Sequence, residues 1–221
     1  MSEEAKKVRE KTADFHDTGF YNFVGWLARW VFPCFFGLKY VHQERVKERE
    51  APYIMIGNHQ QMADPVILAA AVTRYQLVFL AKEELLKNKL LAWAIRRLHA
   101  IPVARHSSDM GALRTCVKTL RDGHILGIFP EGTRHHKGCM EELESGTAML
   151  ALRSGVPLVP VLIPEKFRIF HRNWCIFGED IPTQDLREKG ISNETCQELN
   201  RRITETYRRM LEEYRTEIKK K

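Results

Sequence analysis

The sequence has few cysteines, and none of them are spaced as disulfide or metal-binding pairs usually are. Only five occur in 221 residues: Cys34, Cys116, Cys139, Cys175 and Cys196. Because no C-x-x-C motif is present, the sequence predicts neither a disulfide scaffold nor a zinc ribbon and is typical of a reducing compartment. His135, His136 and Cys139 are close together, but no second pair matches them. We therefore expect a polar loop there, and no metal.

The sequence also lacks a long uninterrupted apolar run. Its first ten residues, MSEEAKKVRE, mix acids and bases, so no secretory signal is expected there. The longest apolar stretch, residues 20–38, contains two Trp and five Phe but is interrupted by Arg29 and Pro33. Both residues are unfavourable in a membrane-spanning helix, whereas Trp rings and an Arg side chain suit the headgroup region. The pattern favours a helix lying on the membrane surface; a core-packed helix pair and a true span are the alternatives.

Several motifs of common enzyme classes are missing. No G-x-S-x-G elbow, phosphate-binding loop or dinucleotide fingerprint occurs. The net charge of +7 indicates an anionic partner, which could be nucleic acid, a phospholipid surface or a phosphorylated substrate. Nucleic acid is the least favoured of these, because the cations are dispersed and mixed with Glu, as in residues 201–213. We expect no nucleic-acid partner.

From residue 52 onward, short apolar runs alternate with longer helical patterns. Residues 53–57, 77–80, 101–103, 125–129 and 158–163 are predicted to be buried strands. Helices are predicted at residues 65–72, 82–98, 109–121, 140–154 and 193–218. This alternation is typical of an α/β fold, with a mainly parallel sheet flanked by helices. We expect an N-terminal helical membrane-attachment element at residues 1–42 and an α/β domain at residues 43–221.

Two residues able to carry out acid–base chemistry follow the first buried strand. His59 comes directly after it, and ligands of open α/β sheets bind beyond the carboxyl ends of strands. A neutral imidazole can accept a proton, and it does so best when a carboxylate holds its other ring nitrogen. Asp64 is five residues further on and could fold back onto His59. The alternative is that Asp64 only caps the next helix, because Asp followed by Pro suits a helix start.

Further polar residues follow two other predicted strands. The segment Phe129-Pro130-Glu131-Gly132-Thr133-Arg134 leaves one of them, and Arg105 leaves another. Gly132 permits a tight turn, and Arg134 offers a planar fork suited to phosphate. Glu131 could orient Arg134 or accept a hydrogen bond from a substrate hydroxyl. If the strands are parallel, these residues and His59 share one edge of the sheet.

Taken in order, these segments resemble the four sequence blocks of glycerolipid acyltransferases. The blocks are His59-x4-Asp64, Val103-x-Arg105, Phe129 to Arg134, and the VPLVPV sequence at residues 156–161. Within that group the chain is most similar to bacterial 1-acyl-sn-glycerol-3-phosphate acyltransferases over residues 50–165, and the aromatic segment looks like their membrane-attaching helices. The resemblance implies transfer of a fatty acyl group from a thioester to the sn-2 hydroxyl of lysophosphatidic acid, forming phosphatidic acid.

The resemblance also implies roles for individual residues. His59 would be the general base, and Asp64 its orienting partner. The phosphate of the acceptor would be bound by Arg105 and Arg134, in a pocket shaped by Glu131, Gly132 and Thr133. No cofactor is expected, since acyl-coenzyme A or acyl-acyl carrier protein serves as co-substrate. A peripheral position on the cytoplasmic face of the cell membrane is expected.

The chain departs from the family pattern in three places. His99 replaces a Gly often found before the second block, Ala104 replaces Asp or Asn, and Glu144 stands where relatives often have Lys. These changes leave the His59 and Asp64 pair intact, but they leave the acceptor open. Glycerol 3-phosphate and another lysophospholipid are the alternatives. A non-catalytic protein that binds anionic membranes is the alternative from a different class.

Overall fold

A seven-stranded sheet forms the centre of the computed structural model, which describes residues 19–103, 110–132, 140–141 and 143–219. The strand order is β1-β7-β6-β2-β5-β3-β4, and every pair of neighbours is parallel except β6 and β7. The strands are β1 (Leu38–Val41), β2 (Ile54–Gly57), β3 (Leu77–Lys82), β4 (Ile101–Val103), β5 (Ile125–Ile128), β6 (Leu158–Leu162) and β7 (Asn173–Phe177). The predicted mainly parallel α/β fold is confirmed.

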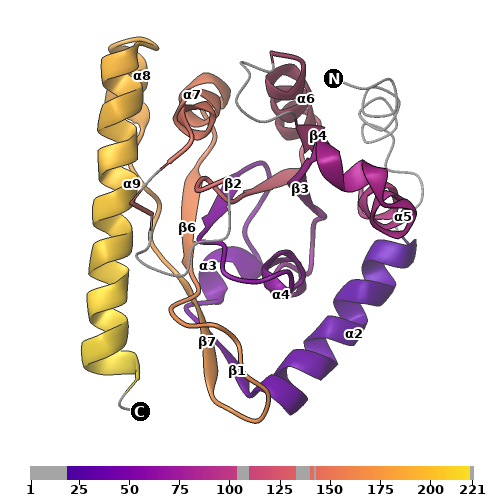
Figure 1. The fold of residues 1–221 in the computed structure, drawn as a ribbon. Helices are drawn as coiled ribbons and strands as arrows, with labels where there is room; N and C mark the ends of the chain where they lie inside the picture. Colours follow the sequence, from indigo (N-terminus) through magenta and orange to yellow (C-terminus); the bar gives the residue numbers. More distant parts are fainter. Residues whose placement is uncertain (1–18, 104–109, 133–139, 142, 220–221) are drawn as a thin grey trace.

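Helices cover both faces of this sheet (Figure 1). Those of the described residues are α2 (Gly19–Phe36), α3 (Glu44–Lys47), α4 (Asp64–Ala71), the 3-10 helix η1 (Glu83–Lys87), α5 (Lys89–Arg97), α6 (Met110–Arg121), α7 (Ser145–Ser154), α8 (Gln184–Glu188), α9 (Asn193–Glu213) and the π-helix η2 (Tyr214–Ile218). The helix α9 is the longest of them and forms one side of the molecule, whereas α2 runs along the opposite side (Figure 1).

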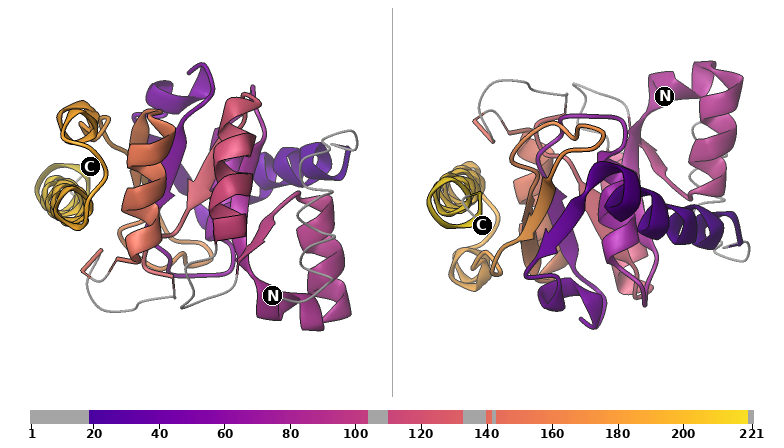
Figure 2. Two further views of the ribbon diagram at one scale, coloured as in Figure 1. Left: turned by 90° about the horizontal axis from the view of Figure 1, so that it is seen from above. Right: turned by 90° about the horizontal axis from the view of Figure 1, so that it is seen from below.

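Alternating side chains of each strand point to two separate hydrophobic clusters. In β2, Ile54 and Ile56 pack with residues of α6, α7 and α9, while Met55 packs with residues of α2 and α4 on the other face. Continuous apolar strands of this kind are expected in a sheet covered on both faces. The two views of Figure 2 show these layers, with α5 set apart from both. The sheet therefore has two cores, and both are closed by helices.

Two strands were not predicted from the sequence. β1 lies at residues that we assigned to the N-terminal element, yet Leu38 to Val41 pair with Asn173 to Ile176 of β7. The sheet thus begins before residue 42, although the proposed division at 42 remains a prediction.

The predicted helix at residues 82–98 is also interrupted. The side chain of Asn88 accepts hydrogen bonds from Leu90 N at 3.0 Å and Leu91 N at 3.1 Å, which starts α5 as a separate helix.

The aromatic segment forms a single helix, α2, with Pro33 inside it. Ala28 and Phe32 are buried against the sheet, whereas Trp26 and Trp30 on the other side are exposed. Within the described residues, no helix combines the length and apolar character needed to cross a bilayer.

Candidate active site

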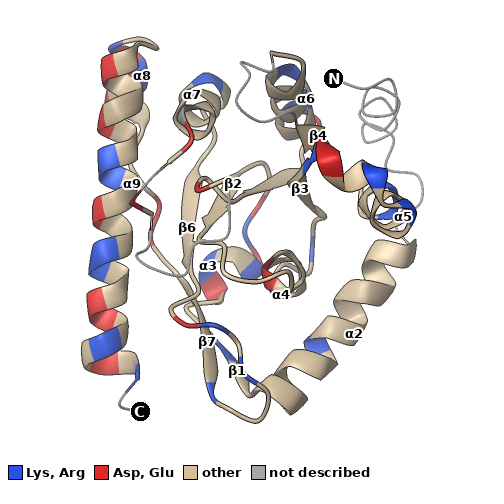
Figure 3. Ribbon diagram, in the orientation of Figure 1, with Lys and Arg blue, Asp and Glu red and all other residues tan. Residues whose placement is uncertain are grey.

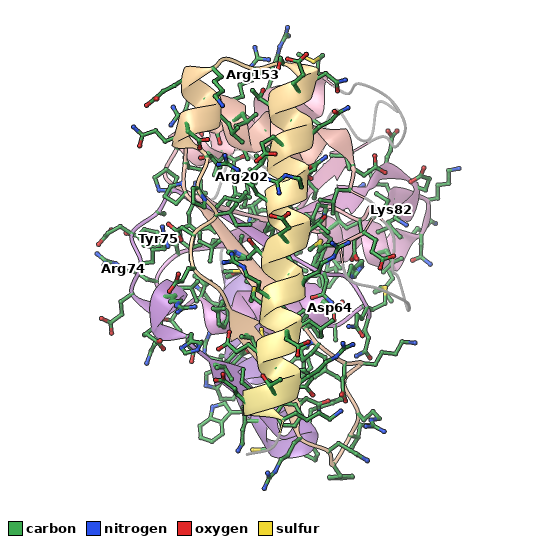
Figure 4. The ribbon with its side chains drawn as sticks, turned by 90° about the vertical axis from the view of Figure 1, so that its left-hand side faces the viewer. Asp64, Arg74, Tyr75, Lys82, Arg153 and Arg202 are labelled. Carbon is green, nitrogen blue, oxygen red and sulfur yellow. The ribbon has the colours of Figure 1, made fainter. Side chains whose placement is uncertain are left out.

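The candidate site lies at the edge of the sheet where its central parallel strands end. β2 ends at Gly57 and is flanked by β5 and β6. Residues that follow β2 and β5 are therefore neighbours at the carboxyl edge, as expected for an open α/β sheet. Figure 4 shows Asp64 and Lys82, the last residue of β3, on one side of the molecule, and Arg74 and Tyr75 on the other. The side with Asp64 is the carboxyl edge.

His59 and Asp64 are in direct contact there. The imidazole Nδ1 lies 2.9 Å from Asp64 Oδ2, a hydrogen-bonding distance. The Asp64 side chain is fully buried, while that of His59 is 18% exposed. A buried carboxylate that accepts from Nδ1–H fixes the tautomer in which the outer nitrogen, Nε2, carries the lone pair. No described residue bonds Nε2. This arrangement can take a proton from a hydroxyl group.

The turn between these two residues is built around the same carboxylate. Asp64 Oδ2 also accepts hydrogen bonds from Gln60 N and Gln61 N, each at 2.7 Å. Asp64 is the first residue of α4, and its carboxylate turns back toward the preceding loop, so it does more than start the helix: it also contacts His59. The loop closes on the carboxylate of Asp64, which explains the spacing of five residues.

Glu131 holds the backbone of His59 in place. Its Oε2 accepts from His59 N at 2.9 Å, and its Oε1 accepts from Met140 N at 3.0 Å. The residue is 7% exposed, so these two N–H groups are paired in a site largely closed to water. Glu131 thereby joins the segments that leave β2 and β5. Its expected contact with substrate remains a prediction, and the structure adds a positional role.

An aromatic stack supports the imidazole from the sheet side. The His59 and Phe129 rings are stacked, with centroids 4.4 Å apart, and Phe79 stacks on Phe129 at 5.7 Å. Gly127 makes room for this stack, since a Cβ there would lie 2.3 Å from the Phe79 ring. The ring of His59 is thus packed on one face and hydrogen-bonded at one nitrogen. Its orientation is determined by β2, β3 and β5 together.

The loop after β2 is also tied to the end of β6. Asn58 donates to Ile163 O at 2.8 Å and accepts from Ile163 N at 2.7 Å, and Gln60 Nε2 donates to the same carbonyl at 2.7 Å. Asn58 is buried. We assigned it no role from the sequence, although an Asn directly before His59 at a strand end is a recognisable signal. These bonds fix the position of the loop relative to the fourth sequence block.

Gly132 adopts a left-handed conformation, with φ of 62°. A Cβ at this position would also lie 2.9 Å from Glu144 Oε1. The predicted tight turn after Glu131 is therefore present. Arg105, Thr133 and Arg134 lie outside the described residues, so their predicted roles as phosphate ligands stay predictions. The same holds for His135, His136 and Cys139.

Lys82 is a further cation at this edge that we did not single out from the sequence. It ends β3 and pairs in register with Val103 of β4, two residues before Arg105. A Lys at the end of a predicted strand was visible in the sequence, but it was included in a predicted helix. The sheet topology places it on the same side as Asp64 (Figure 4).

Comparisons with known proteins concern the family of the whole chain. The family model described as acyltransferase matches residues 38–164, more than half of the chain, a range that contains every candidate site residue. The chain is 31% identical over 124 residues to the 1-acyl-sn-glycerol-3-phosphate acyltransferase of Bacillus subtilis, covering 56% of this chain and 61% of that protein. It is 26% identical over 180 residues to the enzyme of that name from Streptococcus pneumoniae, covering 79% of this chain and 66% of that protein.

The chain thus spans less than two thirds of the length of these curated relatives. The crystal structure of the 1-acyl-sn-glycerophosphate acyltransferase PlsC from Thermotoga maritima superimposes with a TM-score of 0.61 and 26% identity, covering 96% of this chain and 88% of that one. Sequence blocks, fold and site geometry lead to the same result: the chain belongs to the acyltransferase family.

Proposed function

We propose that this protein transfers a fatty acyl group from an acyl thioester to the sn-2 hydroxyl of 1-acyl-sn-glycerol 3-phosphate, forming phosphatidic acid. The observation that carries the proposal is the contact of His59 Nδ1 with the buried Asp64 carboxylate at 2.9 Å, at the carboxyl edge of the sheet. Membership of the acyltransferase family and the names of the relatives support this assignment.

The site supplies one proton acceptor and a means of positioning two reactants. His59 Nε2 takes the proton of the acceptor hydroxyl while the oxygen attacks the thioester carbonyl. The C–S bond then breaks, and the leaving thiolate receives the proton from the imidazolium, which Asp64 stabilises in the meantime. Positioning is worth roughly 7–11 kcal/mol and a general base about 10²–10⁴-fold. No covalent acyl-enzyme is required.

Arg105 and Arg134 are proposed to bind the phosphate of the acceptor. Guanidinium groups form charge-assisted, two-pronged hydrogen bonds with phosphate, which fix the distance between the anion and the reacting hydroxyl. In the sequence, Arg105 comes two residues after the end of β4, and Arg134 comes two residues after Gly132. The acyl donor, which is acyl-coenzyme A or acyl-acyl carrier protein, is proposed as a co-substrate, with no cofactor.

The membrane surface is the proposed location, with α2 as the attachment element. Arg29 is the one charged residue of α2. Figure 3 shows this helix almost without charge, in contrast to the alternating acidic and basic residues of α9. Five large apolar side chains of α2 are exposed: Phe23, Trp26, Leu27, Trp30 and Phe35. Substrates with long acyl chains stay in the bilayer, so the enzyme is proposed to act peripherally on the cytoplasmic face. The described part of the chain also has exposed apolar residues suited to that position.

A thiol-release assay with purified protein tests the proposed reaction. Wild type and His59→Ala are compared with lysophosphatidic acid, glycerol 3-phosphate and lysophosphatidylcholine as acceptors, and with both donor types. We expect rapid release by the wild type only when lysophosphatidic acid is present, formation of phosphatidic acid, and near-complete loss in His59→Ala. Absence of thiol release by both proteins with every acceptor would favour a non-catalytic membrane-binding protein, and equal release by both would show that His59 is not the base. Preference for another acceptor would identify one of the alternative substrates.

The phosphate contacts are tested separately. Arg105→Ala and Arg134→Ala should raise the KM for lysophosphatidic acid by roughly tenfold or more, as expected for loss of a charge-assisted bond, and leave the KM for an uncharged monoacylglycerol unchanged. A similar rise for both acceptors would show that these residues do not bind the phosphate.

A further inference from the structure

Exposed apolar side chains gather around α2 and on the two segments at its ends. Among the described residues, thirteen large hydrophobic side chains are exposed, and nine of them lie on α2, on α5 or in the connection between β6 and β7. The α5 residues are Leu90 and Trp93, and those of the connection are Ile169 and Phe170. Scattered exposed apolar residues are normal, whereas a gathered patch indicates an interaction surface. Figure 1 shows α5 at one end of α2 and the connection at the other.

We propose that α5 and the β6–β7 connection, residues 163–172, are lipid-contacting segments, which flank α2 and orient the open edge of the sheet toward a phospholipid bilayer. The inference rests on the proposed membrane attachment and extends it from one helix to a surface with three parts. An anionic phospholipid surface is the occupant, because each of the two added segments combines exposed apolar tips with exposed cations.

The β6–β7 connection is a well-built structure that is tied to the end of α2. The buried Asn173 accepts from Arg168 N at 3.0 Å and donates to Arg168 O at 2.9 Å; it also donates to Phe36 O in α2. The backbone N–H of Phe170 donates to Phe35 O at 2.7 Å. These bonds hold the tip of the connection beside the exposed Phe35. The tip and the helix end therefore present their apolar side chains together.

Phe170 is the most exposed large hydrophobic residue described, at 81%. Its φ of 59° is in the left-handed region, which is unfavourable for a bulky side chain. A residue keeps a strained backbone conformation only where the surrounding structure holds it there. In Phe170, this conformation directs the aromatic ring into solvent. Neither burial nor the local backbone explains a Phe here, whereas insertion into lipid does.

At the other end of α2, α5 continues the apolar surface. The Phe20 and Trp93 rings meet edge to face, with centroids 4.8 Å apart, so the two helices touch. Leu90 is 72% exposed on the outer side of α5. Trp is favoured at the headgroup level of a membrane, where an apolar ring meets a polar layer. The apolar face of α2 is thus extended by α5.

Exposed basic residues near these apolar side chains favour binding to an anionic surface. Lys87 and Lys89 are exposed next to Leu90, and Lys166 and Arg168 are exposed next to Phe170. Arg168 is 3.9 Å from Glu165, at the limit of an ion pair. Exposed Lys and Arg beside apolar side chains are attracted to anionic lipid headgroups.

The sheet topology places this surface near the candidate active site. The connection begins where β6 ends, and η1 and α5 follow directly on the end of β3, so both segments leave the same edge of the sheet as His59. Contact of both with lipid would bring that edge close to the bilayer. A substrate held by its acyl chain could then reach the site with little movement out of the membrane.

Cosedimentation with vesicles of phosphatidylcholine and phosphatidylglycerol in equal amounts tests the inference. The variants are Leu90→Asp, Phe170→Asp and Trp30→Asp, with Ile191→Asp as the matched control. Ile191 is also exposed but lies between α8 and α9, away from α2. Asp tolerates the left-handed conformation better than Phe, so Phe170→Asp should fold, and an unchanged thermal unfolding midpoint verifies this for each variant.

We expect Leu90→Asp and Phe170→Asp each to weaken vesicle binding roughly tenfold or more, because each change withdraws one apolar side chain from lipid and adds one negative charge. Vesicle binding by Ile191→Asp should be unchanged. Loss of binding in Trp30→Asp, with Leu90→Asp and Phe170→Asp behaving like the control, would overturn this inference and leave attachment through α2 intact. Binding by none of the proteins, wild type included, would overturn both. The thiol-release assay in detergent tests the proposed acyl transfer independently of vesicle binding.

Discussion

Asp64 makes three hydrogen bonds through one oxygen atom. Its Oδ2 accepts from the imidazole of His59 and from the backbone of Gln60 and Gln61, while Oδ1 is buried and has no partner among the described residues. The bonds to the backbone form the turn, and the bond to the imidazole orients the base. In the proposed mechanism, loop structure and catalysis depend on the same group, so a change at Asp64 is expected to affect both.

Glu131→Gln tests whether backbone positioning of His59 matters for turnover. Gln keeps one acceptor oxygen but places an NH₂ group against the second of the two N–H donors that Glu131 now satisfies. The loop should shift, and a misplacement of about 1 Å can cost on the order of 10²-fold. We expect a fall in kcat of that order in the thiol-release assay.

Glu144→Gln is the matched control for this change. Glu144 is nearby and exposed, and its side chain makes no cap bond at the start of α7. Turnover in Glu144→Gln should stay close to that of the wild type. Equal turnover in the two variants would mean that the hydrogen bonds of Glu131 do not position the base.

The pairing of His59 with Asp64 was predictable from the sequence, because a buried strand directly precedes His59 and the spacing allows a turn. The role of Glu131 toward His59 N was not predictable. It depends on the strand order, which places β5 beside β2 although 72 residues separate the two side chains. Sequence spacing carries no information about such long-range neighbours, so from the sequence we expected Glu131 to orient Arg134 or to accept a hydrogen bond from a substrate hydroxyl.

Gly127 in β5 connects the sheet to the site through packing. Because a Cβ at this position would meet the Phe79 ring at 2.3 Å, Gly127→Ala should displace Phe79 and with it the Phe129 ring under His59. Overpacking of this kind costs typically about 1–3 kcal/mol. We expect a loss of unfolding free energy of that size, measured by urea denaturation, together with reduced kcat.

Gly146→Ala provides the comparison. Gly146 lies in α7, and a Cβ added there would have no atom within 4 Å beyond its own helix, so Ala should be tolerated and should stabilise the helix by up to about 1 kcal/mol. If Gly127→Ala were as stable and as active as Gly146→Ala, the aromatic stack would not be needed to hold His59.

The five strands from β6 to β4 were predicted from the sequence, and the two at the other side of the sheet, β1 and β7, were missed. Of the predicted strands, β2, β5 and β6 are buried along their whole length, and β3 and β4 are buried in part. The four residues of β1 directly follow the aromatic helix, so their apolar pattern merges with it. In β7, the residues Asn173 and Trp174 do not suggest a buried strand until β1 is placed beside them. Edge pairing is a tertiary property that short local patterns do not reveal.

A half-buried tyrosine ties each of two N-terminal elements to the rest of the molecule, Tyr21 in α2 and Tyr40 in β1. Tyr40 donates to Ile67 O at 2.9 Å, and Tyr21 accepts from Leu77 N at 2.9 Å. Burial raises the pKa of Tyr21 to about 12 and raises the pKa of Tyr40 well above its ordinary value. The tyrosine side chain of an unfolded chain has a pKa of about 10 and ionises above that pH. In the folded protein, Tyr21 and Tyr40 stay neutral at such a pH.

This difference predicts a loss of stability at alkaline pH. A group whose pKa is raised by folding contributes stability that is complete below the unfolded pKa and declines as pH rises above it. The unfolding free energy should therefore fall from about pH 10 upward, and Tyr40→Phe should fall less steeply than the wild type. Urea denaturation between about pH 8 and pH 11 measures both slopes. Equal slopes would show that Tyr40 ionisation does not contribute.

The most direct test of the whole account is a double-mutant cycle on the pair itself, with kcat measured by thiol release for wild type, His59→Ala, Asp64→Asn and the double variant. If Asp64 acts through His59, Asp64→Asn should lower kcat by roughly 10²–10⁴-fold in the wild type and have almost no further effect once His59 is Ala. Losses that multiply in the double variant, or a His59→Ala protein that still turns over at the wild-type rate, would contradict the proposed mechanism.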